Sequence, residues 1–213
     1  YDGNTDGYVV PVGGGIPTRL TWHPAGDAVQ GFSPDGKQLL FVSTRLSTRT
    51  RIAQLFTVPV AGGPEVPLAI PTAFQATWSP DGKRIAYNPL PRAFEQWKHY
   101  RGGRNSTLLL YTSATNATEK IPQPATRSND VDPMWFGNSV YFRSDRNGEF
   151  NLFAYDITTQ QVKQLTSFTD FPILAASLGG GKIVYERQGY LYLFDPATAQ
   201  SRKLTIGVAA DLR

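Results

Sequence analysis

The sequence predicts an all-β chain arranged as a β-propeller, and three observations carry that prediction. The composition combines 20 Gly and 16 Pro with 40% hydrophobic and 12% aromatic residues, which supplies a core together with many turns. A strand–turn–strand motif recurs along the chain, and a second pair of strands lies between its copies. Short strands paired at a regular interval, with little room for helix, are typical of a radial array of four-stranded sheets.

The first repeat is an apolar strand, a tight turn and a second apolar strand. FSPDGK at residues 32–37 precedes the apolar run 39–41, and WSPDGK at residues 78–83 precedes the run 85–87, an offset of 46 residues. Pro, Asp and Gly together favour a tight turn between two strands. Weaker copies of the same repeat occur at residues 135–142 and 178–185. We expect Asp35, Asp81 and Asp145 to cap turns by accepting hydrogen bonds from backbone amides.

The second repeat is a strand, a glycine-rich or polar turn and a shorter outer strand. Its copies begin at residues 8, 55, 151 and 190 and end in a short Leu-containing segment. Joined to the first repeat, it gives a four-stranded meander that recurs every 39 to 57 residues. We expect Trp22, Trp78 and Trp135 to pack between blades, because large aromatic side chains fill such interfaces.

The repeat spacing divides the chain into blades. We expect a single partial propeller, about four and a half blades of a probable six. The expected blades are a partial blade at 1–24, whole blades at 25–70, 71–124, 125–168 and 169–207, and the start of another at 208–213. The sequence starts at Tyr1 without an initiator Met or a signal-like segment, so we expect a piece of a longer protein.

Charge and residue usage exclude several functional classes. The chain has 21 basic and 17 acidic residues, a net charge of +4, which is too dilute to predict a nucleic-acid partner. It has no Cys and two His, so we expect no metal site and no cofactor. No apolar run approaches the roughly 20 residues that a membrane span needs. The absence of Cys leaves the compartment open between a bacterial or archaeal cytoplasm and the periplasm.

The repeats and three longer stretches resemble a known family. The SPDGK repeat followed by an apolar strand is similar to the propeller repeats of TolB and of the tricorn protease family. The stretches at residues 1–24, 96–104 and 129–156 resemble, in that order, the amino-terminal six-bladed propeller of tricorn-like peptidases. The resemblance covers essentially the whole chain, and it departs at the ends, where half of the first blade and a sixth blade are missing.

The resemblance implies a non-catalytic role for this chain. Tricorn-like enzymes are self-compartmentalised serine peptidases that trim oligopeptides, with propellers ahead of a separate catalytic region. We therefore expect this chain to filter or position oligopeptides for a catalytic region outside it, and to assemble through the parent protein's other domains. A serine nucleophile needs a nearby base, and only His23 and His99 offer an imidazole. We expect no catalytic residue here and a hydrogen-bonded loop role for His23. A TolB-like propeller that binds partner proteins in the periplasm is the alternative.

The segment between Asn88 and Asn105 departs most from the repeat. Basic and aromatic residues are inserted there between two predicted strands, and long insertions in a rigid array often carry function. Its cationic groups could bind a peptide's terminal carboxylate, and its aromatic rings could pack on apolar side chains. The insertion could instead pack on its own blade with Arg101 ion-paired, or stack nucleic-acid bases. The candidate substrate-binding residues are Trp97, Lys98, Tyr100, Arg101 and Arg104.

Overall fold

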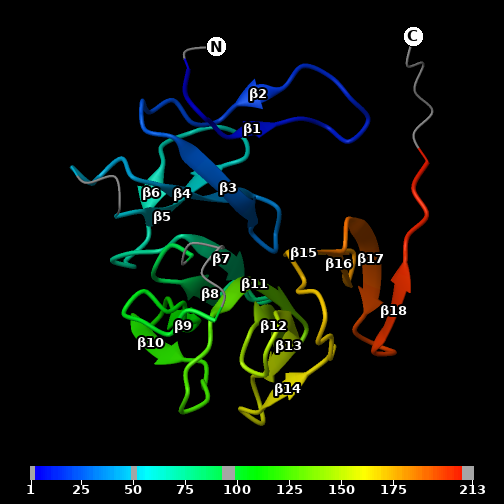
Figure 1. Ribbon diagram of the computed structural model, residues 1–213. Coiled ribbons are helices and arrows are strands. Elements are labelled where there is room, and N and C mark those ends of the chain that lie inside the picture. Colours follow the sequence, from blue (N-terminus) through cyan, green and yellow to red (C-terminus); the bar gives the residue numbers. More distant parts are fainter. Residues whose placement is uncertain (1–2, 49–51, 93–98, 208–213) are drawn as a thin grey trace.

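The computed structural model describes residues 3–48, 52–92 and 99–207, and within these ranges every regular element is a β-strand. Four antiparallel sheets of four strands each follow one another in chain order (Figure 1). The first contains β3 (Asp27–Phe32), β4 (Gln38–Ser43), β5 (Gln54–Pro59) and β6 (Val66–Pro67). The second contains β7 (Gln75–Trp78), β8 (Arg84–Asn88), β9 (Leu109–Thr112) and β10 (Ala117–Lys120). The third contains β11 (Asp130–Phe136), β12 (Ser139–Ser144), β13 (Asn151–Asp156) and β14 (Val162–Gln164). The fourth contains β15 (Ala175–Gly179), β16 (Lys182–Arg187), β17 (Tyr190–Asp195) and β18 (Gln200–Lys203).

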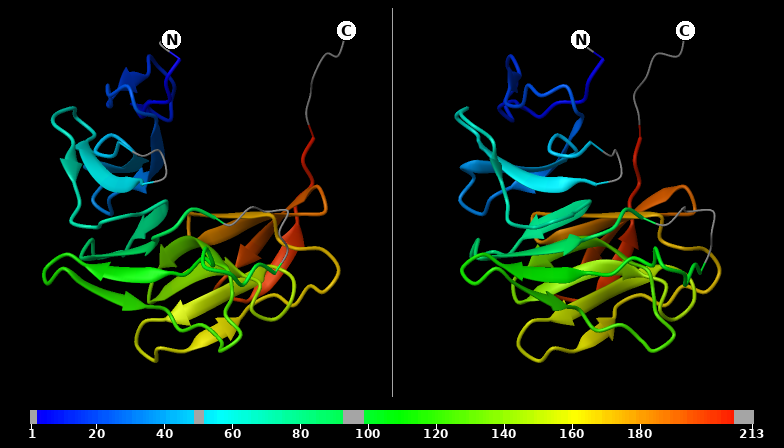
Figure 2. Two further views of the ribbon diagram at one scale, coloured as in Figure 1. Left: turned by 60° about the vertical axis from the view of Figure 1, so that its left-hand side comes forward. Right: turned by 90° about the vertical axis from the view of Figure 1, so that its left-hand side faces the viewer.

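The sheets are the blades of a propeller, so the predicted fold class is confirmed. The first strands of the blades meet at the centre, where β11 packs against β7 and β15, and β3 packs against β7. The last strands, β10, β14 and β18 among them, lie at the periphery (Figure 1). Figure 2 shows the same sheets from two further directions. A short hairpin of β1 (Tyr8–Val9) and β2 (Thr18–Arg19) covers the outer face of the first blade. Residues 208–213, where the start of another blade is expected, lie outside the described residues.

Each blade repeats one register, which is why the repeat is visible in the sequence. The residue before the first turn pairs with the start of the next apolar strand: Phe32 with Leu39, and Trp78 with Ile85. Later blades place Trp135 opposite Val140 and Leu178 opposite Ile183.

The first turn of the two best copies is fixed by its aspartate. The Ser33 hydroxyl donates to Asp35 Oδ1 at 2.6 Å, and the Lys37 amide donates to the same oxygen at 3.1 Å. Asp81 receives the same pair of hydrogen bonds from Ser79 and Lys83. These hydrogen bonds, first the one from the serine hydroxyl, lower the pKa of both carboxyl groups below their ordinary value. Both aspartates therefore cap their turns as predicted.

Apolar side chains fill the space between neighbouring blades. Separate clusters of buried residues lie between the first and second, the second and third, and the third and fourth blades. Trp135 is buried in the second of these clusters, and Trp78 packs against the first. Trp22 is 67% exposed, with the Arg19 guanidinium 4.4 Å from its ring centre. The prediction that Trp22 packs between blades is therefore wrong, because the element beside the first blade here is a two-stranded hairpin and not a four-stranded sheet.

The first and third blades share a buried arginine that the second blade lacks. Arg45 ion-pairs with Asp27 at 2.6 Å and lies over the stacked rings of Phe41 and Phe56. In the third blade the corresponding pair is Arg146 with Asp130 at 3.0 Å, over Phe142 and Phe153. Both arginines follow a serine by two residues, and that serine accepts a hydrogen bond from the arginine Nε. At the corresponding place the second blade has residues 89–91, Pro-Leu-Pro, where the insertion begins.

Candidate functional site

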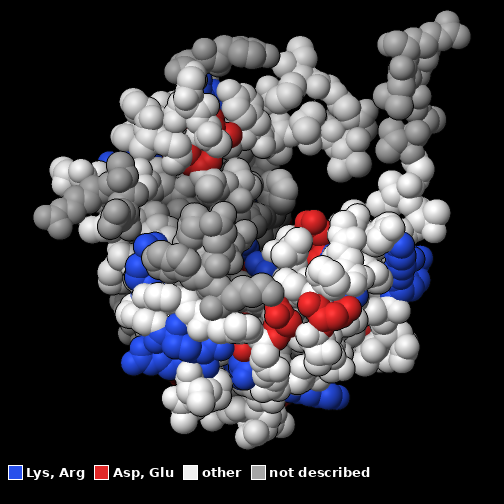
Figure 3. All heavy atoms as spheres, viewed as in Figure 1, with Lys and Arg blue, Asp and Glu red and all other residues white. Residues whose placement is uncertain are grey.

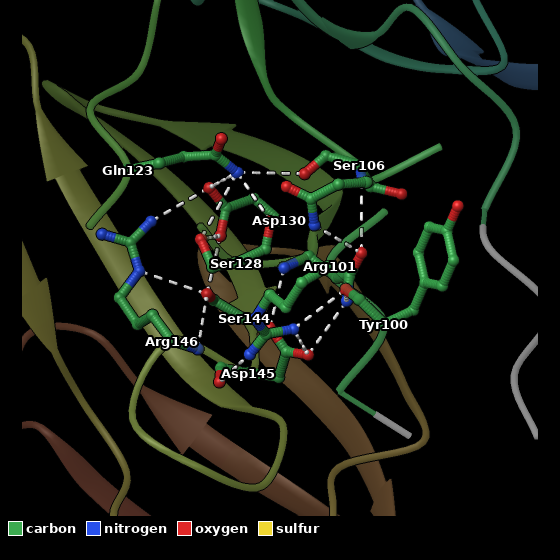
Figure 4. Close-up of polar contacts among 11 residues, drawn as sticks. Tyr100, Arg101, Ser106, Gln123, Ser128, Asp130, Ser144, Asp145 and Arg146 are labelled. Atoms are coloured by element: carbon green, nitrogen blue, oxygen red, sulfur yellow. Dashed lines mark hydrogen bonds and ion pairs between the residues drawn. The ribbon is translucent and has the colours of Figure 1, made fainter. Parts of the chain in front are cut away.

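The insertion leaves the second blade after β8 and returns at β9, and its described flanks lie against the third blade. Residues 93–98 lie outside the described part of the chain. On the far flank, Arg101 Nη1 donates to Asp145 Oδ2 at 2.7 Å, and Nη2 donates to the Asp145 carbonyl at 3.3 Å (Figure 4). The Asp145 side chain is 1% exposed and that of Arg101 is 31% exposed. The insertion is thus tied to the neighbouring blade through a buried carboxylate.

Asn129 completes this anchor from the start of the third blade. Its backbone amide donates to Asp145 Oδ1 at 2.7 Å, and its side-chain amide donates to Asp145 Oδ2 at 3.0 Å and to the Tyr100 carbonyl at 2.9 Å. Its side-chain oxygen accepts from Asn105 at 2.8 Å. One asparagine therefore joins both sides of the blade boundary. Asp145 accepts a backbone amide from a residue 16 positions earlier. The prediction that it caps its own turn is therefore wrong, because the buried carboxylate faces Asn129 and the insertion.

Next to the Arg101–Asp145 anchor, an extensive polar network joins the ends of the third blade (Figure 4). Gln123 donates to the Ser128 carbonyl at 2.7 Å and to Asp130 Oδ2 at 3.1 Å. The Ser144 hydroxyl donates to Asp130 Oδ1 at 2.6 Å. Because these groups are buried or half-buried and share several hydrogen bonds, this part of the blade boundary is expected to be rigid.

The near flank carries a second ionic anchor that sequence reasoning missed. Arg92 ion-pairs with Asp132 Oδ1, and Arg143 ion-pairs with Asp132 Oδ2. Gln75 donates to Asp132 Oδ1 at 2.8 Å. Asp132 lies in a β-bulge of β11 and has φ +56°, a left-handed conformation that Asp tolerates better than most residues. Neither the pairing nor the bulge has a local sequence signal, apart from Pro133 directly after the aspartate.

A cavity of about 310 Å³ lies at the centre of the propeller, and we call it the central cavity. Asp132 belongs to its wall, so the near anchor of the insertion lies beside it. The lining comes from the first strands of all four blades: Gln30, Gly31, Gln75, Ala76, Thr77, Asp132, Pro133, Met134, Ala176, Ser177 and Leu178.

The structure separates the predicted site residues by what they contact. Arg101 is held by Asp145, whereas Arg104 is exposed and its side chain makes no ion pair with the described residues. The Arg104 backbone amide donates to the Tyr100 hydroxyl at 3.3 Å. A Cβ at Gly102 would overlap the Tyr100 hydroxyl, so a larger residue there would have to displace the Tyr100 ring. Trp97 and Lys98 lie outside the described residues.

One further exposed basic residue reaches the insertion, because Arg127 Nη1 donates to the Arg101 carbonyl at 3.2 Å. Exposed lysines lie on the outermost strands, Lys120 on β10, Lys163 on β14 and Lys203 on β18. Figure 3 shows basic side chains mostly around the rim of the molecule, with acidic side chains closer to its centre. The positive charge is thus dispersed over the rim in this view.

In the part of the chain that the structure describes, no hydrogen bond joins the imidazole of either histidine to a hydroxyl or a carboxylate. His23 Nδ1 accepts a hydrogen bond from the Ala25 amide at 3.0 Å, in the loop role expected of it. His99 is exposed, with φ +56°. Among the described residues no group of three or more His, Asp or Glu side chains is placed to hold a metal ion. No helix long and apolar enough to cross a membrane occurs in the same ranges.

Comparison with known proteins agrees with this architecture. Residues 1–200 match the model of the tricorn protease N-terminal beta propeller domain. The chain belongs to this family. It is 28% identical over 181 residues to the tricorn protease of Thermoplasma acidophilum, covering 84% of this chain and 16% of that protein. The crystal structure of the tricorn protease superposes with a TM-score of 0.80 at 25% identity, covering 98% of this chain and 20% of that one.

The propeller is also similar in fold to TolB. The crystal structure of TolB from Acinetobacter baumannii has a TM-score of 0.69 at 19% identity, and the match covers 93% of this chain and 48% of that one. The chain spans about a fifth or less of the length of the two tricorn proteins that it matches.

Proposed function

We propose that this propeller is a non-catalytic domain of a tricorn-like serine peptidase, and that it filters or positions oligopeptides for a catalytic region outside this chain. Membership of the tricorn propeller family supports the setting. The absence of a nucleophile–base arrangement around His23 and His99, as far as the structure describes them, is consistent with a role in binding.

The observation that carries the proposal is the way the insertion is held. Arg92 and Arg101, on its two flanks, are each paired with a buried carboxylate of the third blade. These pairs hold the insertion against the propeller and leave the Arg104 guanidinium exposed. A guanidinium on a well-held loop suits a carboxylate, because its planar donors match the two oxygens. Arg104 is therefore assigned the contact to a peptide carboxylate, and Arg101 supports the loop.

The remaining candidates complete this assignment. Tyr100 supplies an aromatic ring on the same flank of the insertion as Arg104, and its hydroxyl accepts a hydrogen bond from the Arg104 backbone amide. Trp97 and Lys98 stay in the proposed site as an aromatic and a cationic group of the same insertion. An apolar side chain near a peptide's end would pack on the aromatic groups, and the cations would bind its charge.

The test uses the complete parent protein and a pair of peptides that differ only in a free or amidated carboxyl terminus. The proposal expects faster cleavage of the free acid and loss of most of that preference in Arg104→Ala. Lys120→Ala, at an exposed position of β10, is the control, because it also removes one positive charge. Equal cleavage of both peptides before and after the substitution would contradict the proposal and favour a TolB-like role in binding partner proteins.

A further inference from the structure

The first strand of each blade has one edge toward the propeller centre, and in the second and third blades a glutamine of the preceding blade covers this edge. Gln30 of the first blade accepts a hydrogen bond from the Ala76 amide of β7 at 3.0 Å. Gln75 of the second blade accepts one from the Asp132 amide of β11 at 3.3 Å. An unpaired edge amide is a ready donor for another chain, and the two glutamines occupy these donors.

This cover is missing in the fourth blade. Ala176 of β15 pairs with Tyr185 at the same register as Ala76 pairs with Tyr87. The Ala176 amide therefore points away from β16 and toward the centre, as the Ala76 amide does. No described side chain accepts a hydrogen bond from it. In the third blade Val131 stands at the register position of Gln75 and offers no acceptor. The bulge of β11 contains Asp132, as the bulge of β3 contains Gln30, but the Asp132 carboxylate is engaged by Gln75, Arg92 and Arg143.

The uncovered edge faces free space. Ala176, Ser177 and Leu178 belong to the wall of the central cavity. The side chains along β15 are mostly small, with Ala175, Ala176, Ser177 and Gly179 among its five residues, so a second main chain can approach closely. Main-chain groups facing the same edge recur at every second residue of a strand, which places Leu178 as the next donor and acceptor after Ala176.

We propose that the inner edge of β15 binds an extended peptide by strand addition, through the main-chain groups of Ala176 and Leu178. The inference rests on the proposed function, since it gives the oligopeptide a second point of contact. Strand addition recognises the peptide main chain and tolerates different side chains. Such a site suits a domain that handles oligopeptides of varied sequence, and it needs no charged group on the ligand.

The test uses the ¹⁵N-labelled 213-residue chain and a peptide of alternating Thr and Val, acetylated at its amino terminus and amidated at its carboxyl terminus. A twin peptide is N-methylated at every internal residue, which removes its main-chain donors. The blocked peptide is expected to shift the amide resonances of Ala176 and Leu178. The methylated twin is expected to bind roughly tenfold more weakly or not at all, because at least two main-chain hydrogen bonds are lost.

Two substitutions examine the protein side. Ala176→Pro removes the inward-facing donor without removing a hydrogen bond to β16, and Ala176→Val keeps that donor at similar bulk. The valine variant is expected to bind and the proline variant to lose binding. If circular dichroism shows that the proline variant does not fold, the comparison of the blocked peptide with its N-methylated twin on the unsubstituted chain tests the proposal.

Equal binding of both peptides, or unchanged amide resonances of Ala176 and Leu178 at millimolar peptide, would overturn the inference. The edge of β15 would then be hydrated by solvent. Because neither peptide has a free carboxylate, this result is independent of Arg104. The strand-addition site and the carboxylate contact of the proposed function can therefore fail separately.

Discussion

Arg101 and Asp145 are 44 residues apart in the sequence and form a 2.7 Å ion pair across the boundary between the second and third blades. The carboxylate is buried and also accepts hydrogen bonds from Asn129. The pair fastens the far flank of the insertion, so its first effect is on stability and its effect on binding is indirect.

Replacing Arg101 with alanine is expected to lower the free energy of unfolding by about 1 to 3 kcal/mol, because a buried carboxylate loses a charged donor while keeping its two bonds from Asn129. Urea unfolding followed by circular dichroism measures this. Arg104→Ala is the matched control, and a change within about 0.5 kcal/mol is expected for that exposed residue. Equal losses in the two variants would show that the ion pair contributes nothing.

Asp132 is expected to be the more sensitive anchor, because it is buried and pairs with both Arg92 and Arg143. Asp132→Asn keeps the shape and tolerates the left-handed backbone, so its cost isolates the charge. We expect a loss of about 3 to 5 kcal/mol, since Arg143 is left buried with a weaker partner. Glu119→Gln, which removes a carboxylate charge at an exposed position of β10, should change stability little. A loss below about 1 kcal/mol in Asp132→Asn would contradict this account of the anchor.

Comparison of the first and third blades predicts a stabilising substitution. Asp130 Oδ1 accepts from the Ser128 hydroxyl at 2.8 Å, whereas the corresponding Asp27 Oδ1 is buried without a hydrogen-bond partner among the described residues. Ala25 stands where Ser128 stands, two residues before the aspartate. Ala25→Ser is expected to raise stability by about 0.5 to 1.5 kcal/mol, the net value of one hydrogen bond. Ala25→Val, which adds bulk without a hydroxyl, should bring no gain, and a stabilised valine variant would refute the explanation.

The turn aspartates predict how stability depends on pH. Hydrogen bonds, first those from Ser33 and Ser79, lower the pKa of Asp35 and Asp81 below the ordinary value of 3.8. The unfolded chain then binds more protons in this range, so the contribution of these turns is present above about pH 4 and is lost as pH falls through the lowered pKa. Melting temperatures of the unchanged chain and of Asp81→Asn, measured from pH 6 down to about pH 2, should converge at the acid end. If the difference in melting temperature between the two proteins stays constant across that range, ionisation of Asp81 does not contribute to the pH dependence of stability.

The blades are predictable from the sequence because local chemistry encodes them. The Ser33–Asp35 and Ser79–Asp81 hydrogen bonds lie within one turn, so the repeated residues and their spacing predict strands, turns and fold class together. The anchors of the insertion are not predictable in this way, since Asp132 and Asp145 lie 40 and 44 residues beyond their arginines. Their pairing depends on how neighbouring blades pack. The prediction for Trp22 fails for a related reason, because whether a ring is covered depends on the extent of the neighbouring hairpin.

The proposed function depends on a contact between the exposed Arg104 guanidinium on the anchored insertion and a peptide's terminal carboxylate. The most direct measurement is the affinity of this chain for one oligopeptide as the free acid and as the amide, by calorimetry at low and high salt. We predict tighter binding of the acid, by roughly tenfold for one charge-assisted contact, a smaller difference at high salt, and no difference in Arg104→Ala. Equal affinities for acid and amide, or a preference that Arg104→Ala leaves intact, would contradict the claim.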